Sequence, residues 1–355
     1  MLKRGFLLLI GIIAWTFAQA QDPQYSQFYA APLYLNPAFT GSAMAPRVNF
    51  NHRNQWPSLS ANFVTSSLSA DMYLDKINSG VGILMTTDRQ FTNLTTVDVG
   101  ATYSYHLKLS DNLTAKLGVQ GSYVTRGINF ADYTFGDQIA TYINSGYSAF
   151  PRLSSDQILQ GGANTNPQLK YWDFSTGALV YSEQFWVGAS LHHLNQPTQS
   201  FNDKDIRLPM KIGVQAGYRI PLADYVIGNN LGDAIEREKS ITPVIHYKRQ
   251  GASDQLDVGA YLTYSPMVLG LWYRGIPLKT YTKDDVSIIS HDAAVILIGY
   301  RQDNFSIGYS YDATISRLGS TGGAHEISLS YVFTDWIEPR KHGRPRKGEL
   351  KCPKF

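Results

Sequence analysis

The chain has 355 residues with a formal net charge of +3, one cysteine, 23 tyrosines, 16 phenylalanines, 6 tryptophans and 30 glycines. A single cysteine excludes an internal disulfide framework, and the dispersed basic residues exclude a stripe that binds nucleic acid. Many aromatic residues and glycines with only 17% charged residues are typical of a β-barrel or β-sandwich rich in turns.

The first twenty residues have the pattern of an export signal. Lys3 and Arg4 form a basic start, residues 6–17 are an apolar stretch, and residues 18–20 are a small-residue cleavage site. A transmembrane anchor is the alternative, but the apolar stretch is shorter than the roughly 20 residues of a spanning helix. We therefore expect a signal peptide that is removed before Gln21.

The next segment, QDPQYSQFYAAPLYLNPAFTGS over residues 21–42, has neither a helical nor a strand period. Pro32 and Pro37 prevent a continuous helix, and Gly41 suits a turn into the first strand. We expect residues 21–47 to form a periplasmic segment that packs on the inner wall of a barrel or across its periplasmic mouth. The residues expected to make this plug are Tyr25, Phe28, Tyr29, Tyr34, Asn36, Pro37 and Phe39. A plug that only closes the barrel and a segment that binds a partner both remain open.

Alternation of apolar and polar residues dominates the rest of the chain. From Val97 to Leu109 every second residue is apolar, whereas those between are polar or glycine, and the pattern recurs over 210–222 and 305–312. A period of two predicts β-strands with one apolar face. A soluble sandwich also alternates, so the pattern alone leaves both architectures open.

Strand number and turn length favour a membrane barrel. About fourteen alternating segments lie near 48–54, 62–72, 79–87, 95–109, 113–127, 172–182, 185–194, 209–222, 240–248, 255–265, 267–275, 290–301, 304–314 and 324–334. Even-numbered connections are mostly tight, as at 110–112 and 183–184, and odd-numbered ones mostly long, as at 128–171 and 276–289. Such alternation is typical of outer-membrane barrels. The exception is 223–239, an even connection that is not short.

We therefore expect an all-β fold, one closed transmembrane antiparallel β-barrel of about 14 strands over residues 48–334. Closure matters because an open sheet edge would leave unpaired backbone groups in lipid. Apolar faces would contact the bilayer and polar faces would line the lumen, with both termini in the periplasm of an outer-membrane protein. The long loop 128–171 would face outward and bind an exported partner, or pack on itself as a lid. Its aromatic residues include Tyr133, Phe135, Tyr142, Tyr147, Phe150 and Tyr171.

The basic tail over 335–355 follows the closing strand. Residues 334–355 include seven Lys or Arg and three acidic residues. We expect this periplasmic tail to dock on a periplasmic partner, because it also holds apolar residues that disorder does not favour; a solvated basic end is the alternative. The residues expected to dock are Trp336, Arg340, Lys341, Arg344, Arg346, Lys347, Leu350, Cys352, Pro353 and Phe355.

Signatures of catalysis are incomplete. HEISL at His325 ends in Leu329, where a zinc signature needs a second histidine. GASLH ends in His192, where a nucleophile elbow needs glycine. His192 and His193 are expected on opposite faces of one strand. We expect no catalytic residue, metal or cofactor; a passive porin is the main alternative function, and an outer-membrane enzyme is less favoured.

Three segments carry a resemblance to a known family: residues 21–42, YKRQGASDQLDVGAYLTYSPMVLGLWYRGIPLK over 247–279, and the closing CPKF. They resemble hallmark segments of the PorP/SprF family, outer-membrane proteins of the type IX secretion system of Bacteroidetes. The resemblance implies a fourteen-stranded barrel that supports secretion or surface retention of proteins, including gliding-motility adhesins. It also implies an exported substrate, such as an adhesin C-terminal domain, at the outer face, and ring or peptidoglycan-binding components at the inner face. A core role and a dedicated role for one substrate both remain open.

Overall fold

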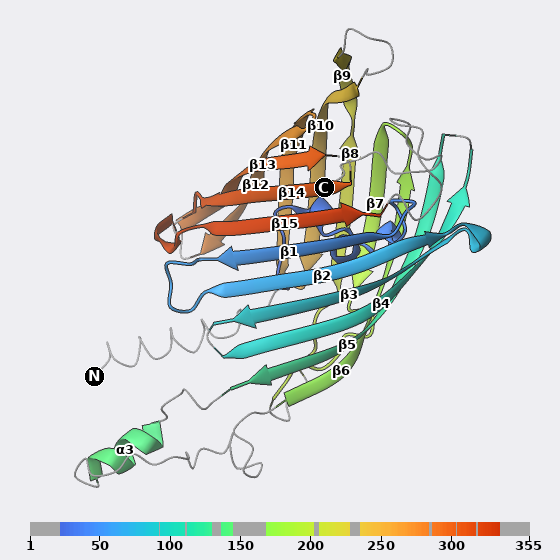
Figure 1. Cartoon of the computed structure of the whole chain (residues 1–355). Coiled ribbons are helices and arrows are strands. Elements are labelled where there is room, and N and C mark those ends of the chain that lie inside the picture. The colour runs from blue at the N-terminus through green and yellow to red at the C-terminus, as the bar shows by residue number, and fades with distance from the viewer. Residues whose placement is uncertain are drawn as a thin grey trace.

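The computed structural model describes residues 22–91, 93–110, 112–129, 136–144, 168–201, 206–227, 235–283, 286–302, 304–316 and 319–333. Most of them belong to one sheet that curves into a barrel (Figure 1). Its strands are β1 (Arg47–Gln55), β2 (Phe63–Leu74), β3 (Ser79–Gln90), β4 (Leu94–Lys108), β5 (Thr114–Ile128), β6 (Gln168–Tyr181), β7 (Phe185–His192), β8 (Lys211–Tyr218), β9 (Ile220–Ile227), β10 (Ile235–Gln250), β11 (Ser253–Tyr264), β12 (Met267–Lys283), β13 (Val286–Gln302), β14 (Phe305–Thr314) and β15 (Ala324–Val332).

These fifteen strands occupy fourteen positions in a closed antiparallel ring. β8 pairs with the second half of β10 and β9 with its first half, so β8 and β9 are one strand position interrupted at Arg219. Pro243, which has no N–H for a ladder, lies beside the interruption in β10. β15 pairs with β1 along its whole length, from Arg47 to Gln55, and so closes the ring. The predicted fourteen-stranded barrel is confirmed.

The alternation seen in the sequence decides which side chains face outward. In β4, Val99 and Tyr103 are exposed on the outside, whereas Thr102 and Ser104 are buried. The same holds around the ring; Leu117 of β5 and Leu271 of β12 are among the most exposed side chains, at 66% and 63%. An apolar outer band of this kind is what a barrel presents to lipid. Among the described residues, no helix is long and apolar enough to cross a membrane.

Each predicted segment corresponds to one strand position, but two connections were predicted wrongly. Residues 276–289 are mostly strand, because β12 and β13 continue to pair as far as Lys283 and Val286. The even connection predicted at 223–239 shortens to 228–234 between β9 and β10. Hydrophobic alternation marks only strand residues with one buried or lipid-facing side. Each of these extensions lies beyond a register shift in its strand pairing, at 239/240 and over 274–280, where the alternation is interrupted.

The two ends of the barrel differ in their connections. At the end that we call the turn end lie short connections such as 75–78, 109–113 and 182–184. The opposite end, which we call the loop end, carries the long connections 129–167 and 193–210. After residue 46, the helices among the described residues are η4 (Asp75–Ile77), α3 (Gly136–Asn144) and η5 (Gly319–Thr321).

Candidate functional site: a lumen filled by the N-terminal segment

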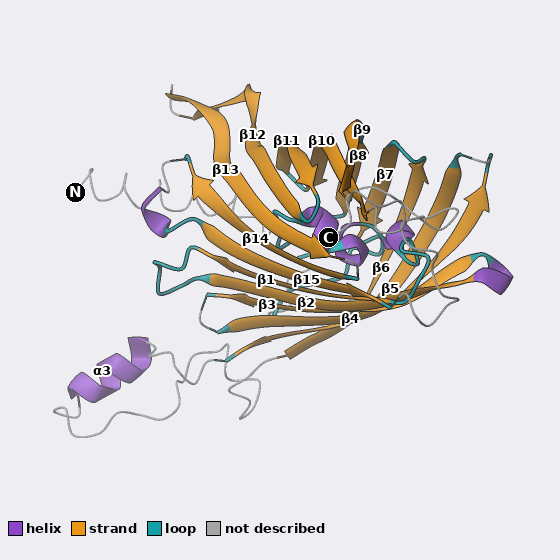
Figure 2. Ribbon diagram, turned by 45° about the horizontal axis from the view of Figure 1, so that its top comes forward, coloured by secondary structure: helices purple, strands orange, loops and turns teal. Residues whose placement is uncertain are grey.

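Residues 22–46, which we call the N-terminal segment, lie inside the ring of strands (Figure 2). They form three single turns, η2 (Phe28–Ala30), α2 (Pro32–Leu35) and η3 (Pro37–Phe39). Pro32 and Pro37 stand at the start of α2 and η3, where a missing N–H costs nothing. The chain changes direction between them at Asn36, whose side chain accepts a hydrogen bond from the backbone N–H of Ala38. The prolines thus divide the segment into short turns that follow the lumen.

The segment runs along the barrel axis. Near the turn end, the N–H of Gly41 donates to Asp71 at 2.7 Å and Ser104 donates to the carbonyl of Thr40 at 2.7 Å. Asp22 lies at the loop end, where it contacts Lys211, the first residue of β8. The N-terminal segment therefore crosses the lumen with its first residues at the loop end.

This course differs from the expectation that both ends of the chain share one mouth. Phe333, which follows β15, donates its N–H to the carbonyl of Pro46 at the turn end, whereas Asp22 lies at the opposite end. The prediction considered only the shortest path from a cleavage site to the first strand. It left out the polar residues of the segment itself, which pair with polar wall positions near the loop end.

Glycines in the wall allow the segment to approach the strands closely. A Cβ at Gly118 in β5 would overlap the backbone of Pro37 and Ala38. One at Gly177 in β6 would overlap the side chain of Asn36. The Asn36 amide in turn donates to the carbonyls of Ala178 and Ala189 at 3.1 and 2.9 Å, and so contacts both β6 and β7. The fit at this level depends on the absence of a side chain.

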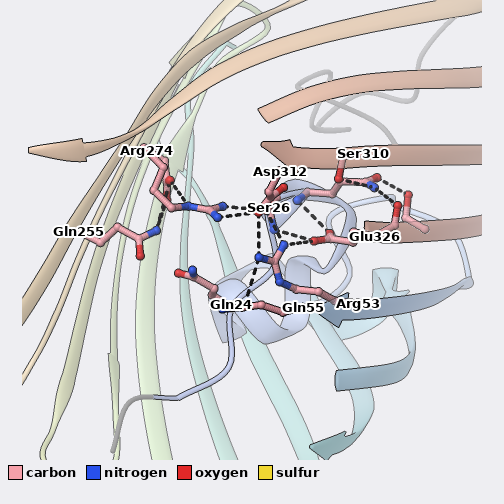
Figure 3. Close-up of polar contacts among 12 residues, drawn as sticks. Gln24, Ser26, Arg53, Gln55, Gln255, Arg274, Ser310, Asp312 and Glu326 are labelled. Carbon is pink, nitrogen blue, oxygen red and sulfur yellow. Dashed lines mark hydrogen bonds and ion pairs between the residues drawn. The ribbon is translucent and has the colours of Figure 1, made fainter. Parts of the chain in front are cut away.

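A buried charged cluster holds the segment near the loop end (Figure 3). We use this name for Ser26 together with Arg53, Arg274, Asp312 and Glu326, which lie on β1, β12, β14 and β15. The Ser26 hydroxyl donates to Asp312 at 2.6 Å and accepts from Arg53 at 2.6 Å and from Arg274 at 2.7 Å. These three bonds use the whole capacity of a hydroxyl group.

Glu326 recognises the backbone of the segment. Its side chain is fully buried and accepts the N–H of Ser26 at 2.7 Å and the N–H of Gln27 at 2.9 Å. Gln27 also donates to Ser310 and accepts from Ser328. Arg53 lies 3.2 Å from Glu326 and gives it a charged partner. A buried carboxylate is costly unless it is paired and hydrogen-bonded. Both carboxylate oxygens of Glu326 thus have hydrogen-bond donors when the segment is in place.

Asp22 occupies a second polar site, the Asp22 site, formed with His193, Lys211 and Gln250. Its carboxylate lies 2.7 Å from His193 and 2.8 Å from Lys211, and it accepts from Gln250 at 3.1 Å. The other ring nitrogen of His193 contacts Asp173 at 2.8 Å. Burial alone would lower the pKa of His193, but Asp22 and Asp173 raise it to about 9. Burial would raise the pKa of Asp22, but Lys211 and His193 hold it well below its usual range.

Aromatic packing fills the lumen between these polar contacts. Tyr29 lies edge-on to Tyr261 at a ring distance of 4.5 Å and stacks on Trp272 at 6.2 Å. Val295 and Leu297 of β13 are also buried on this side. The expectation that polar faces line the lumen is therefore incomplete. In β10 to β13, apolar residues such as Tyr261, Trp272 and Val295 occupy some of the inward positions, beside polar ones such as Asp257 and Arg274.

The spaces that described residues of the segment help to line differ in size. Two spaces beside the segment measure about 50 and 100 Å³. A third, of about 330 Å³, opens at the loop end and is lined by Gln24, Arg53, Gln55, Trp56 and Asp292, among others. We call it the mouth cavity. Gln24 of the N-terminal segment forms part of its wall.

The structure describes only some of the site residues predicted from the sequence. Of the N-terminal set, Tyr25, Phe28, Tyr29, Asn36, Pro37 and Phe39 are buried in the lumen and Tyr34 is half-buried. Tyr142 lies half-buried in α3. The other loop residues, Tyr133, Phe135, Tyr147 and Phe150, lie outside the described residues. So do the export signal over 1–20 and the whole docking set of the tail.

Sequence reasoning missed the polar partners of the segment. Arg53, Arg274 and Glu326 occupy strand positions whose side chains face the lumen. Most other polar residues at such positions are short and uncharged, so a charged residue there is unusual. That signal was available, although it does not say which residues meet.

His192 and His193 were predicted wrongly to point to opposite faces. His193 follows β7 with a φ of 59°, which turns the chain so that both rings lie inside, 6.4 Å apart. Within the described ranges, no group of three or more potential ligands could hold a metal ion.

Comparisons with known proteins give a family and several barrels. The model of the family described as type IX secretion system membrane protein PorP/SprF matches residues 17–331. No curated protein matches the chain. The outer membrane protein Omp33 of Acinetobacter baumannii matches with a TM-score of 0.41 and 7% identity over 83% of this chain and 100% of that one. The toluene transporter TodX of P. putida matches with a TM-score of 0.44 and 11% identity over 84% and 92%. A mutant porin of Rh. blastica matches with a TM-score of 0.32 and 10% identity over 81% and 99%.

Proposed function

Because the chain belongs to the PorP/SprF family of type IX secretion system membrane proteins, we propose that it supports the secretion or surface attachment of exported proteins without acting as an enzyme or a pore. The observation that carries this proposal is the filled lumen. Asn36 is fully buried between segment and wall, and so is the Glu326 side chain. A barrel closed in this way acts through the surfaces at its two ends.

We place the protein in the outer membrane with the turn end toward the periplasm. Short periplasmic turns and longer outer loops are the rule for bacterial barrels. The tail after Phe333 then starts in the periplasm, because Phe333 is bonded to Pro46 at the turn end. Exposed ion pairs contribute only about 0–1 kcal/mol each. Docking of the tail on a periplasmic or peptidoglycan-binding component therefore depends on its apolar residues Trp336, Leu350 and Phe355 as well as on its charge.

The outer face would bind the exported substrate, such as an adhesin C-terminal domain. The connection between β5 and β6 is far longer than the ordinary loops of roughly 4–6 residues. Ile139 and Ile143 of α3 are 46% and 51% exposed, on a connection of the loop end. Exposed apolar side chains outside the lipid band suit a protein contact. This connection is our proposed substrate surface, and a role in gliding motility would follow from the substrate.

Two deletions test the proposed function. Truncation after Asp335 should leave a heat-modifiable barrel in the membrane, because β15 is complete, but should abolish co-purification of periplasmic machinery. Deletion of 136–165 should abolish surface retention of the exported substrate. A matched control replaces residues 59–61, in another connection of the loop end, with three glycines and should change neither readout. Normal secretion and normal partner retention in both deletion variants would contradict the proposal.

A further inference from the structure

We propose that the N-terminal segment is threaded through the barrel from the inside outward, so that the first residues of the mature chain are displayed at the outer face. The inference rests on the orientation given in the proposed function. It replaces the expectation of a periplasmic N-terminus with a surface element made by the chain itself. Any partner that meets the loop end would then meet the N-terminal residues as well.

The order of contacts gives the direction of the segment. Gly41 lies against Gly80, the second residue of β3, at the turn end. Further into the lumen, Ala38 lies against Gly118 of β5. Ser26 then bonds to Asp312, which is near the end of β14 and so near the loop end. The segment thus runs from the turn end at Gly41 to the loop end at Asp22, but not along a straight path, because the Tyr34 hydroxyl already donates to the carbonyl of Pro23.

The Asp22 site lies at the rim of the barrel. His193 is the first residue after β7, Lys211 is the first of β8 and Gln250 is the last of β10. Gln250 also accepts the N–H of Asp22 at 2.9 Å, so the site contacts both the carboxylate and the backbone of this residue. The wall at β7, β8 and β10 does not extend beyond Asp22. The N-terminal end of the described segment therefore lies at the rim on the side of the loop end.

The neighbouring mouth cavity provides open space at the same level. Gln24 lines it together with Gln55 and Trp56, where β1 passes into the connection to β2. The N-terminal end therefore borders an opening of about 330 Å³. Small extensions at this end can be accommodated without disturbing the aromatic packing around Tyr29.

The closed ring limits when the N-terminal segment can enter the lumen during folding. The strands pair all the way round, from β1 through β10 to β15 and back to β1. A segment bonded to β6, β8, β14 and β15 cannot enter sideways once these pairs exist. Its leading end must therefore be in the lumen before the ring closes, or must pass along the lumen afterwards.

The test places a short uncharged epitope tag immediately before Asp22 in the full chain and probes intact cells with an antibody. Two matched insertions report the orientation: one after Ser58, at the loop end, and one after Lys76, at the turn end. Heat-modifiability of each variant confirms that the barrel has formed. We expect the tags before Asp22 and after Ser58 to be detected on intact cells, and the tag after Lys76 only after the outer membrane is opened.

The outcomes separate the two proposals. If the tag after Ser58 is detected but the tag before Asp22 is not, threading is wrong while the orientation stands. If the tag after Lys76 is detected instead of the tag after Ser58, the orientation is wrong and the surface display falls with it. A second variant avoids an insertion: Gln24→Cys, in a chain that also carries Cys352→Ser, should react with a membrane-impermeant maleimide on intact cells. Reaction only after the outer membrane is opened would overturn the proposal.

Discussion

The two halves of the N-terminal segment are held by different physical means. Around Ser26 and Gln27, charged side chains of four strands bond to the segment. Around Asn36 and Ala38, the backbone of the segment lies against wall glycines, and one side-chain amide bonds to two strand carbonyls. The first half depends on charge and hydrogen bonding. The fit around Asn36 and Ala38 depends mainly on shape.

The difference matters because the two kinds of contact fail differently. A steric overlap with backbone atoms leaves the segment no place to lie, since neither strand nor segment can shift within a packed interior. Loss of one charge leaves the space intact, but its former partner stays buried without a hydrogen-bond or ion-pair partner, which costs free energy. Substitutions in the two halves should therefore differ in size and in their dependence on pH.

The largest effect is expected for Gly118→Val. The added side chain would overlap the backbone of Pro37 and Ala38, so the N-terminal segment should be expelled, at a cost on the order of 4 kcal/mol or more. Proteolysis of the segment in the purified, folded barrel measures the expulsion. Gly121→Val is the control on the same strand, because a Cβ there makes only ordinary contacts with Phe174, at 3.5 Å and beyond. Equal protection of the segment in both variants would contradict the steric account.

A smaller effect is expected for Glu326→Ala in the charged cluster. The substitution removes the acceptor of two segment N–H groups and leaves Arg53 without one of its two carboxylate partners. Breaking a buried pair costs roughly 3–5 kcal/mol, and because Arg53 keeps Asp312 as a partner, we expect a loss at the lower end, about 3 kcal/mol. The thermal midpoint of the heat-modifiability shift should fall accordingly. Asp75→Ala, an exposed change at the turn end, serves as the control; a midpoint for Glu326→Ala within error of this control would refute the role of the cluster.

The smallest effect is expected at the Asp22 site and depends on pH. His193→Asn removes a charged partner of Asp22, worth about 2 kcal/mol, while Asn still accepts the left-handed backbone. Because the pKa of His193 is raised from 6.5 to about 9, the contribution is fully present below pH 6.5 and is lost as the pH rises through about 9. Thermal midpoints of wild type and variant should differ at pH 6 and converge at pH 10. A difference that is the same at both values would exclude the ion pair.

Much of the fold could be predicted because the lipid-facing side of each strand repeats every second residue. Val99, Tyr103 and Leu117 are examples that mark their strands without reference to any partner. Strand ends beyond the bilayer were not predictable in this way. In β12 the register with β13 shifts between Ile276 and Thr280, so the pairing of residues 280–283 appears only in the structure.

The site was predictable in part. Prolines and aromatic residues indicated a segment that is neither helix nor strand and that needs cover from water. They did not give its direction, because direction depends on which distant polar residues meet. Ser26 and Glu326, for example, are separated by 300 positions. The sequence around either residue does not indicate that the two are in contact.

The central claim, that the N-terminal segment closes the lumen, is tested most directly by single-channel conductance of the purified full chain in planar bilayers. We predict no steady conductance for the full chain, and a steady ion current for a variant that lacks residues 22–40, provided its barrel remains heat-modifiable. A full chain that conducts steadily at the level of an open porin would contradict the account.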